Sequence, residues 1–287
     1  MSNILHKDRS PRVSIIIPYY NHGKFIDETL ASIDRIEDKN LYEVIIVNDG
    51  SPDPFSDKRL KEIAMLGYYL VVQQENQGVS VARNNAVAHA RGEYILPVDS
   101  DNKIKPEYVY EAMAVLDNNK DIDIVYSDYD LFGAQTGVRR AGEYNFQRLL
   151  LDNFIENCAL VRKSVFDKTG GYDPFFRKIG IEDWDLWLNA AFAGCKFHYI
   201  PKPLFDYRVA ESSRIDLTIA NKRNGAIAVD YFIKKYKDQY GLQYVDEYFL
   251  DKFRPNFLGF LGKIVLKLYF PKMYDKMVNS GKFRKYL

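Results

Sequence analysis

The stretch VSIIIPYYNHGKFIDETLASI, residues 13–33, decides the fold class. It begins with a short β-branched run that Pro18 ends, which is typical of a strand buried on both faces. Helical spacing follows from residue 23 to 36, with an apolar face made of Phe25, Ile26, Leu30 and Ile33. A buried strand followed directly by an amphipathic helix is the first half of a βαβ unit.

The same alternation continues along the first half of the chain. Apolar runs predict strands over residues 42–47, 68–73, 94–98 and 122–126, and helical spacing predicts helices over 57–66, 79–90 and 106–118. Strands that alternate with helices of this length predict an α/β fold with a mostly parallel sheet flanked by helices. After residue 130 the alternation is less regular, and further helices are expected over 182–193 and 219–237.

The composition is that of a globular protein and excludes several classes. The chain is 47% hydrophobic and 28% charged with a net charge of +1, which argues against a nucleic-acid partner. The two cysteines, Cys158 and Cys195, predict neither a disulfide framework nor a Cys/His metal site.

Residues 1–12 lack an apolar segment, and no apolar run is long enough to cross a bilayer. We therefore expect neither a signal peptide nor a transmembrane helix, and a cytoplasmic location.

The last part of the chain is strongly basic. Residues 251–287 hold nine Lys and Arg against two Asp, and apolar residues at helical spacing alternate with lysines over 257–270. Such a segment favours peripheral binding to the inner face of a membrane through residues 256–287, with packing on the domain or on a second subunit as the alternative. We expect a main domain over residues 1–215 and a helical, basic C-terminal extension over 216–287.

Carboxylates follow two of the predicted strands at the point where each strand ends. Asp49 follows one apolar run, and Asp99 and Asp101 follow another. Ligands of an open α/β sheet bind beyond the carboxyl ends of its strands, so we expect these side chains at one crevice. Two carboxylates two residues apart in a turn suit Mg²⁺ or Mn²⁺, which bridge protein oxygens and substrate phosphates. The alternative is a solvated turn, in which Asp and Ser are common.

Two other segments carry polar groups with open interpretations. The loop 76–78 opens a helix that bears Arg83, and free N–H groups at such a helix start attract phosphate, although an ordinary capped helix explains the same residues. Glu182, Asp183 and Asp185 fall in the first turn of another helix, where the helix dipole favours acids. A carboxylate there, beside Trp184, also suits a general base.

Six segments together resemble, in the right order, the signatures of inverting family 2 glycosyltransferases. They are VSIIIPYYN (13–21), IIVNDGSPD (45–53), ENQGVSVARNNA (75–86), GEYILPVDSDN (92–102), GGYDPFF (170–176) and EDWDLWLNAAFAG (182–194), and the resemblance covers roughly residues 12–210. It implies a GT-A fold with a Rossmann-like sheet. It also implies an enzyme that transfers a sugar from a nucleotide-diphosphate donor, usually a UDP-sugar, to a hydroxyl of a glycan or polyprenol-linked acceptor.

The resemblance assigns roles to individual residues. It places a nucleotide against Pro18, Tyr20, Asp49, Arg83, Asp99 and Ser100, and a Mn²⁺ or Mg²⁺ ion on Asp99 and Asp101. It makes Asp183 the catalytic base, with Glu182 helping to orient the acceptor. Trp184 and Arg208 are expected near the acceptor and the diphosphate.

One segment departs from the family pattern. Tyr207-Arg208-Val209-Ala210 stands where many members have Tyr-Arg-x-His, so a third metal contact is missing from the pattern. This keeps open a non-catalytic module of the same fold that binds a sugar nucleotide or glycan. A dinucleotide oxidoreductase and a P-loop NTPase are excluded, because the chain lacks GxGxxG after the first strand and lacks GxxxxGK[ST]. The sequence does not decide the donor sugar, the acceptor or the linkage. It also leaves the oligomeric state open, and a homo-oligomer is one possibility.

Overall fold

The computed structural model describes residues 10–150, 152–178 and 180–210, together with 231–232, 235–236, 269–270 and 272–273. The protein divides into two compact units, Met1–Lys235 and Tyr236–Leu287. The sheet and its helices belong to the first unit. The first unit extends past the boundary expected at residue 215, because residues 231, 232 and 235 pack on it. Most of the helical extension expected over 216–287, including the helix over 257–270, lies outside the described residues.

The first half of the sheet is parallel and follows the βαβ alternation. It contains β1 (Val13–Tyr19), β2 (Tyr42–Asp49), β3 (Leu70–Gln74) and β4 (Tyr94–Pro97), in the order β3-β2-β1-β4. Ile15 in β1 pairs with Val44 on one side and with Leu96 on the other, and all three are buried. Because these strands are parallel, their carboxyl ends, and the loops that follow them, share one edge of the sheet.

The second half of the sheet is mixed, within the expected α/β fold of a mostly parallel sheet flanked by helices. Antiparallel pairs join β8 (Leu160–Arg162) to β4 and β6, β7 (Gly137–Arg139) to β6, and β5 (Lys103–Ile104) to β9, whereas β6 (Ile124–Gly133) and β9 (Phe197–Val209) are parallel. The hairpin from β6 to β7 has no room for a crossover helix, which a parallel connection needs. This is the region where the sequence alternation weakens.

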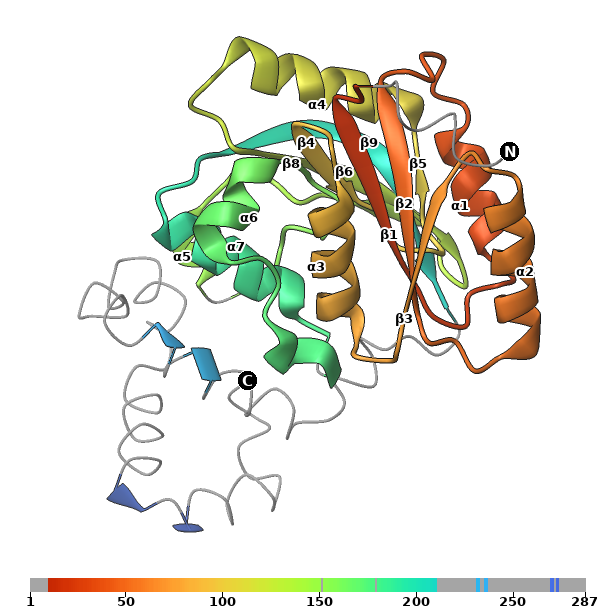
Figure 1. The fold of residues 1–287 in the computed structure, drawn as a ribbon. Helices are drawn as coiled ribbons and strands as arrows, with labels where there is room; N and C mark the ends of the chain where they lie inside the picture. The colour runs from red at the N-terminus through yellow and green to blue at the C-terminus, as the bar shows by residue number, and fades with distance from the viewer. Residues whose placement is uncertain are drawn as a thin grey trace. The chain divides into compact units, whose positions relative to one another are not determined.

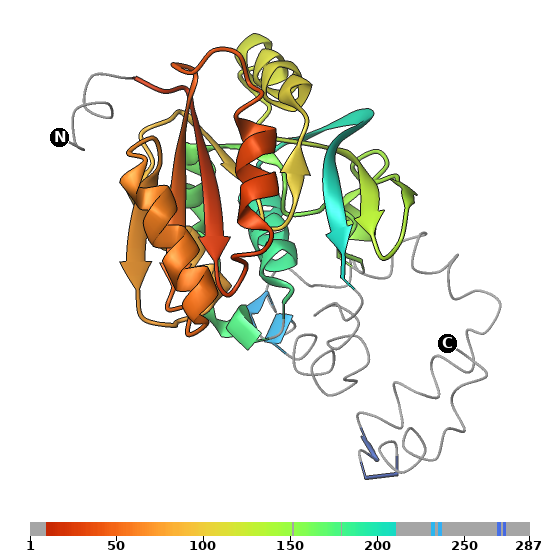
Figure 2. The same ribbon diagram turned by 90° about the vertical axis from the view of Figure 1, so that its right-hand side faces the viewer.

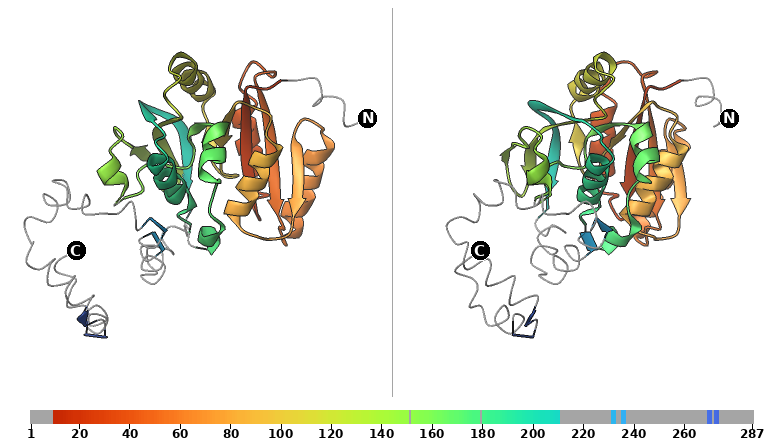
Figure 3. Two further views of the ribbon diagram at one scale, coloured as in Figure 1. Left: turned by 60° about the vertical axis from the view of Figure 1, so that its left-hand side comes forward. Right: turned by 90° about the vertical axis from the view of Figure 1, so that its left-hand side faces the viewer.

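Helices cover both faces of the sheet (Figures 1 and 2). One buried cluster joins alternate residues of β1 and β2, such as Ile15 and Ile46, to α1 (Ile26–Ile33), α2 (Pro54–Met65) and α4 (Pro106–Asn118). On the other face α3 (Val79–His89) lies against β1 and β2 through its buried alanines, Ala82 and Ala86. Figure 3 shows α6 (Lys163–Thr169) and α7 (Glu182–Phe192) on the same side as α3. None of the helices in the described residues has the length and apolar content needed to span a bilayer.

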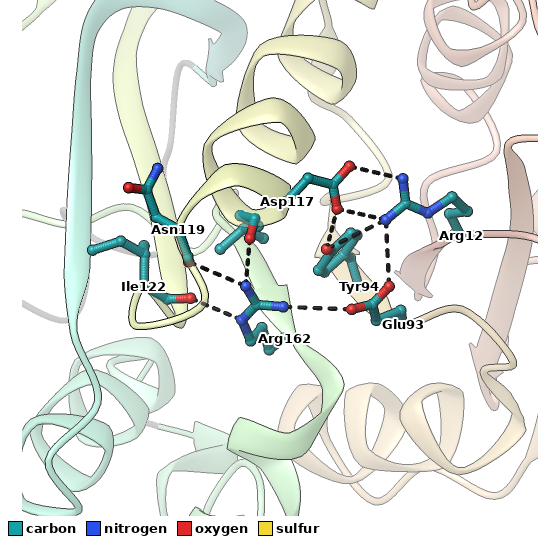
Figure 4. Close-up of polar contacts among 8 residues, drawn as sticks. Arg12, Glu93, Tyr94, Asp117, Asn119, Ile122 and Arg162 are labelled. Carbon is teal, nitrogen blue, oxygen red and sulfur yellow. Dashed lines mark hydrogen bonds and ion pairs between the residues drawn. The ribbon is translucent and has the colours of Figure 1, made fainter.

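Two arginines, Arg12 and Arg162, bond the C-terminal end of α4 (Figure 4). Arg12 makes two bonds to Asp117, at 2.8 and 2.6 Å, and these hydrogen bonds lower the pKa of Asp117 to about 2. Arg162 donates to the carbonyls of Leu116 and Ile122, at 2.6 and 2.8 Å. Leu116 lies in the last turn of α4, where carbonyls have no partner within the helix, so Arg162 supplies one.

We expect Arg162→Ala to lower the free energy of unfolding by about 2 kcal/mol, because it leaves carbonyls at the end of α4 without a charged donor. The Arg162 side chain is only 12% exposed, so water replaces it poorly. Denaturant unfolding measures the loss. Lys196→Ala is the control, because Lys196 pairs with Asp121 at the surface and is 60% exposed; equal effects of the two substitutions would contradict the assignment.

Candidate active site

The loop after β4 presents the two carboxylates of the Asp-Ser-Asp segment at the sheet edge. Asp99 and Asp101 are both partly exposed, and both belong to a turn closed by the bond from the Asn102 N–H to the Asp99 carbonyl, 3.0 Å. Ser100 between them is 2% exposed, and its hydroxyl lies 2.8 Å from Nδ1 of His22. His22 follows β1, so the loops after β1 and β4 are joined where parallel strands end. Ser100 is therefore already engaged by the protein.

Arg83 connects the Asp-Ser-Asp loop to α7. Its guanidinium donates to Asp99 and to Glu182, each at 2.6 Å, and its side chain is 4% exposed. Burial works against the charged form, but the charges of Asp99 and Glu182 outweigh it and raise the pKa of Arg83. Sequence reasoning placed Arg83 near a nucleotide; the structure gives it the further role of holding two acidic segments together.

Asp49 holds the glycine loop rather than pointing freely into solvent. One carboxylate oxygen accepts from the Gln77 N–H at 2.7 Å and from the Gln74 side chain, and the other accepts from the Gly78 N–H at 2.9 Å. Gly78 has a φ of 93°, which a side chain would strain, and it precedes the first residue of α3. The contact of Asp49 with a base stays a prediction. Pro18 is buried at the end of β1, and Tyr20 just after it is partly exposed.

The first turn of α7 carries a carboxyl group whose proton affinity is unusual. Asp183 accepts from the Asn153 side chain at 2.9 Å and from the Trp184 N–H at 2.8 Å. Burial, together with the charge of Glu182, nevertheless raises the pKa of Asp183 to about 7. Glu182 is 7% exposed, and its Oε2 has no hydrogen-bond partner among the described residues. A carboxylate that titrates near neutrality is suited to accept a proton.

Sequence reasoning missed the segment 153–158, which contributes three side chains to this site. Asn153 bonds Asp183, and Asn157, with its amide oriented to donate to Tyr172, accepts from Arg83 Nε at 3.2 Å. Burial and then the charges of Asp99 and Asp183 raise the pKa of Glu156 well above its usual range. The segment is irregular, so neither periodicity nor a turn signal marks it in the sequence.

Two predicted acceptor or diphosphate residues are held by the protein itself. Arg208 lies between the rings of Phe25 and Phe132, at 4.6 and 4.3 Å, and its Nε donates to the Asp101 carbonyl at 3.0 Å. The indole N–H of Trp184 donates to the Leu149 carbonyl at 2.6 Å. Arg208 thus supports the backbone of the loop that bears Asp101, and the predicted direct contacts of both residues with a ligand stay predictions.

A lysine far along the chain fastens α7 from outside the expected domain. Lys235 Nζ lies 2.7 Å from both Asp173 and Asp185, and Asp185 in the first turn of α7 is fully buried. Nearby, Tyr231 stacks on Phe175 with ring centroids 3.8 Å apart, and Phe232 packs edge-on to Trp184 at 5.1 Å. These contacts fix the turn that bears Asp183.

We expect Lys235→Met to destabilise this domain by about 2 kcal/mol, since it leaves the buried Asp185 carboxylate without its lysine. The double variant with Asp185→Asn should recover part of the loss, as a double-mutant cycle would show. Lys202→Met is the matched control, because Lys202 pairs with Glu111 but is 58% exposed. A loss in Lys235→Met no larger than in this control would contradict the role assigned to the pair.

Asp99 and Asp101 at the sheet edge suit a divalent cation that takes further ligands from a phosphate. Asp99 uses one oxygen for Arg83 and keeps the other without a hydrogen bond among the described residues. In that part of the chain, no group of three or more His, Cys, Asp and Glu is close enough to hold a metal alone. A site of two carboxylates suits Mg²⁺ or Mn²⁺, which take their other ligands from water and substrate phosphates.

Comparisons with known proteins agree with this architecture. The family model described as "Glycosyl transferase family 2" matches residues 14–179. An uncharacterized glycosyltransferase of Rickettsia typhi is 31% identical over 219 residues, 72% of this chain and 64% of its own length. The glycosyltransferase GlyG of Streptococcus pneumoniae is 34% identical over 198 residues, 69% of this chain and 59% of its own. The chain thus spans less than two thirds of the length of these relatives.

Solved structures share the fold. S. aureus TarS in complex with UDP-GlcNAc superposes with a TM-score of 0.61 at 20% identity, over 89% of this chain and 81% of that one. The mannosyltransferase PcManGT from Pyrobaculum calidifontis, in complex with GDP-Man and Mn²⁺, gives 0.59 at 19% identity, over 78% of this chain and 65% of that one. At this identity the likeness shows a common fold.

Proposed function

Because the chain belongs to glycosyl transferase family 2, we propose that it is an enzyme that moves a sugar from a nucleotide-diphosphate donor to a hydroxyl of an acceptor, with inversion at the anomeric carbon. The proposal rests mainly on one observation: Arg83 bonds both Asp99 and Glu182, and Asp183 is the residue next to Glu182. These residues come from a β4 loop, α3 and α7. Their connection supports a site in which the proposed metal ligand Asp99 and the proposed base Asp183 act on one substrate.

The proposed reaction needs two things from the protein. The acceptor oxygen forms a bond to the anomeric carbon as the bond from that carbon to the diphosphate oxygen breaks, and the acceptor proton passes to the Asp183 carboxylate. A bound Mn²⁺ or Mg²⁺ on Asp99 and Asp101 would offset the charge that develops on the leaving diphosphate. Asn153 and the Trp184 N–H hold the Asp183 carboxylate in a fixed orientation.

Relatives of the same fold support the choice of donor class. One was solved with UDP-GlcNAc and another with GDP-Man and Mn²⁺. We infer a nucleotide-diphospho-sugar donor for this chain, a UDP-sugar first, with Pro18 and Tyr20 lining the nucleotide site and Asp49 in contact with the base. The acceptor we propose is a glycan or a polyprenol-linked glycan.

The test of the proposal is turnover of a donor panel. UDP-, GDP- and dTDP-sugars with Mn²⁺ are offered together with simple glycoside acceptors, and release of the nucleoside diphosphate is followed. One donor should be consumed, and NMR of the product should show the anomeric configuration opposite to that of the donor. Retention of configuration would overturn the inverting mechanism. Binding of a nucleotide sugar without any turnover would favour a binding module of the same fold.

We further propose that the basic segment 256–287 binds an anionic membrane surface, which suits a polyprenol-linked acceptor and a peripheral cytoplasmic enzyme. The support is the excess of seven positive charges over residues 251–287. The full chain should sediment with vesicles of anionic lipid, and a form ending at residue 250 should stay in the supernatant. Added salt should release the full chain. Equal sedimentation of the two forms would contradict this role.

A further inference from the structure

The hairpin of β6 and β7 ends in an arginine that the protein itself does not bond. Arg139 is the last residue of β7, and within the described sheet β7 pairs with β6 alone. Its exposed guanidinium makes no ion pair or hydrogen bond with any described residue. By contrast, the partly exposed Arg12 and Arg59 each bond an aspartate, at 2.6 and 2.7 Å. Arg139 is therefore available to a ligand.

The strand register places Arg139 beside a tyrosine that leads to the acidic loop. Arg139 and Tyr129 are directly opposite each other in the antiparallel pair of β6 and β7, so their side chains are neighbours on one face. The ring of Tyr129 lies 5.6 Å from that of Tyr207. Arg208, the next residue, bonds the Asp101 carbonyl at 3.0 Å. Arg139 thus stands at the far end of a short row of side chains that begins at this loop.

The electrostatics of Tyr129 relate Arg139 to the proposed base. Burial and then the charge of Glu156 raise the pKa of Tyr129. The charge of Arg139 acts against this rise, whereas the charge of Asp183 adds to it. The guanidinium and the Asp183 carboxylate are therefore both within electrostatic reach of one hydroxyl. A molecule that brings a hydroxyl to Asp183 has its neighbouring groups close to Arg139.

The chain directly after Arg139 is held in place by two hydrogen bonds. Asp128, which is 4% exposed, accepts from the Ala141 N–H at 2.9 Å. The Tyr126 hydroxyl donates to the Gly142 carbonyl at 2.8 Å. Because the backbone beside Arg139 is fixed in this way, a ligand that binds there orders little more than the arginine side chain, which favours binding.

The chemistry of a guanidinium selects the ligand. It binds a phosphate or a carboxylate through two parallel hydrogen bonds, and such charge-assisted bonds are about twice as strong as bonds between neutral groups. Arg83, which also lies near the base, already bonds Asp99 and Glu182 at 2.6 Å each. An anionic group of a substrate therefore finds a partner in Arg139 rather than in Arg83.

We propose that Arg139 binds an anionic group, a phosphate or a carboxylate, of the acceptor whose hydroxyl Asp183 activates. The inference rests on the proposed function, since it assumes that the acceptor approaches Asp183. The phosphate of a polyprenol-linked acceptor and the phosphate or carboxylate of a soluble glycan offer the same chemistry to Arg139. The experiment separates these sources.

The experiment is calorimetric titration of the full chain, saturated with UDP and Mg²⁺ so that phosphate does not enter the donor site. The probes are geranyl phosphate for a lipid-borne phosphate, glucose 6-phosphate for a soluble phosphate, methyl glucuronide for a carboxylate, and methyl glucoside as the uncharged reference. At least one anionic probe should bind about tenfold more tightly than methyl glucoside, and Arg139→Gln should remove this gain while UDP binds as before. The anionic probe that binds identifies the source.

Arg140→Gln is the matched control. Arg140 carries the same charge, is also exposed, and makes no bond with a described residue, but successive side chains of an extended chain lie on opposite faces. Its substitution should change the affinity of the anionic probe by less than about twofold. Neither substitution should change Tm, because neither guanidinium has a partner to lose.

The proposal is overturned if no anionic probe binds better than methyl glucoside, or if Arg140→Gln weakens binding as much as Arg139→Gln does. Weaker binding of UDP to Arg139→Gln would also overturn it, because Arg139 would then belong to the donor site. Absence of binding by UDP, GDP and dTDP alike would instead defeat the proposed function itself, so the two failures are distinguishable.

Discussion

Asp183→Asn is expected to reduce kcat by about 10²- to 10⁴-fold, with nucleotide affinity preserved. The amide keeps the size of the carboxyl group and can still bond the Trp184 N–H, but it cannot take the proton of the acceptor hydroxyl. The measurement is the steady-state rate with the donor that the panel identifies, together with calorimetric binding of its nucleotide.

The pH dependence of the wild type gives a second readout of the same residue. The pKa of Asp183 is raised to about 7, so the deprotonated base is the minority form below that pH. We expect kcat to rise as pH increases through about 7 and then to level off. Asp167→Asn is the control, because Asp167 is an exposed residue of α6. A variant Asp183→Asn that keeps more than a tenth of the wild-type rate would contradict the role of Asp183 as base.

Arg83→Met is expected to be the most destabilising single substitution, at about 3–5 kcal/mol, because it leaves two carboxylates without their counter-charge. Glu182 is 9% exposed at its side chain and Asp99 30%, so water compensates Asp99 better than Glu182. Nucleotide binding should fall as well, because the loop that carries Asp99 loses its connection to α7. Thermal and denaturant unfolding give the stability, and calorimetry gives the affinity.

The conservative variant Arg83→Lys separates charge from geometry. A lysine keeps the positive charge but cannot reach Asp99 and Glu182 with two separate nitrogens, so an intermediate loss of stability is expected. Arg59→Met is a matched control, since Arg59 also bonds two carboxylates, Asp27 and Glu62, but at the surface. If Arg83→Met lowers the free energy of unfolding no more than Arg59→Met does, the bonds from Arg83 to Asp99 and Glu182 do not hold the site together.

The parts of the site that strand topology dictates could be predicted from the sequence. Asp49, Asp99 and Asp101 follow apolar runs, and the carboxyl ends of parallel strands meet at one edge whatever the side-chain details are. The first half of the sheet was predicted for the same reason. In its second half, the short hairpin after β6 makes β7 antiparallel, and irregular polar segments give no periodic signal for the direction of β5 and β8.

The contacts that join distant segments could not be predicted. Arg83 and Glu182 are 99 positions apart, and nothing in their local sequence says that a buried arginine will choose that partner. Glu156 lies in a segment without periodicity, and Lys235 reaches Asp185 from beyond the expected domain boundary. Arg208 lies beside the ring of Phe132 and bonds the Asp101 carbonyl, contacts that the sequence does not show, and its expected contact with a diphosphate stays a prediction. Such choices depend on packing in three dimensions.

Calorimetric titration of the chain with UDP, with and without Mn²⁺, examines the proposed donor site itself. We expect UDP to bind in the presence of Mn²⁺, binding to weaken at least about tenfold without the metal, and Asp101→Ala to remove the difference. Failure of UDP, GDP and dTDP to bind under any metal condition would contradict the claim that this sheet edge is the donor site of a sugar transferase.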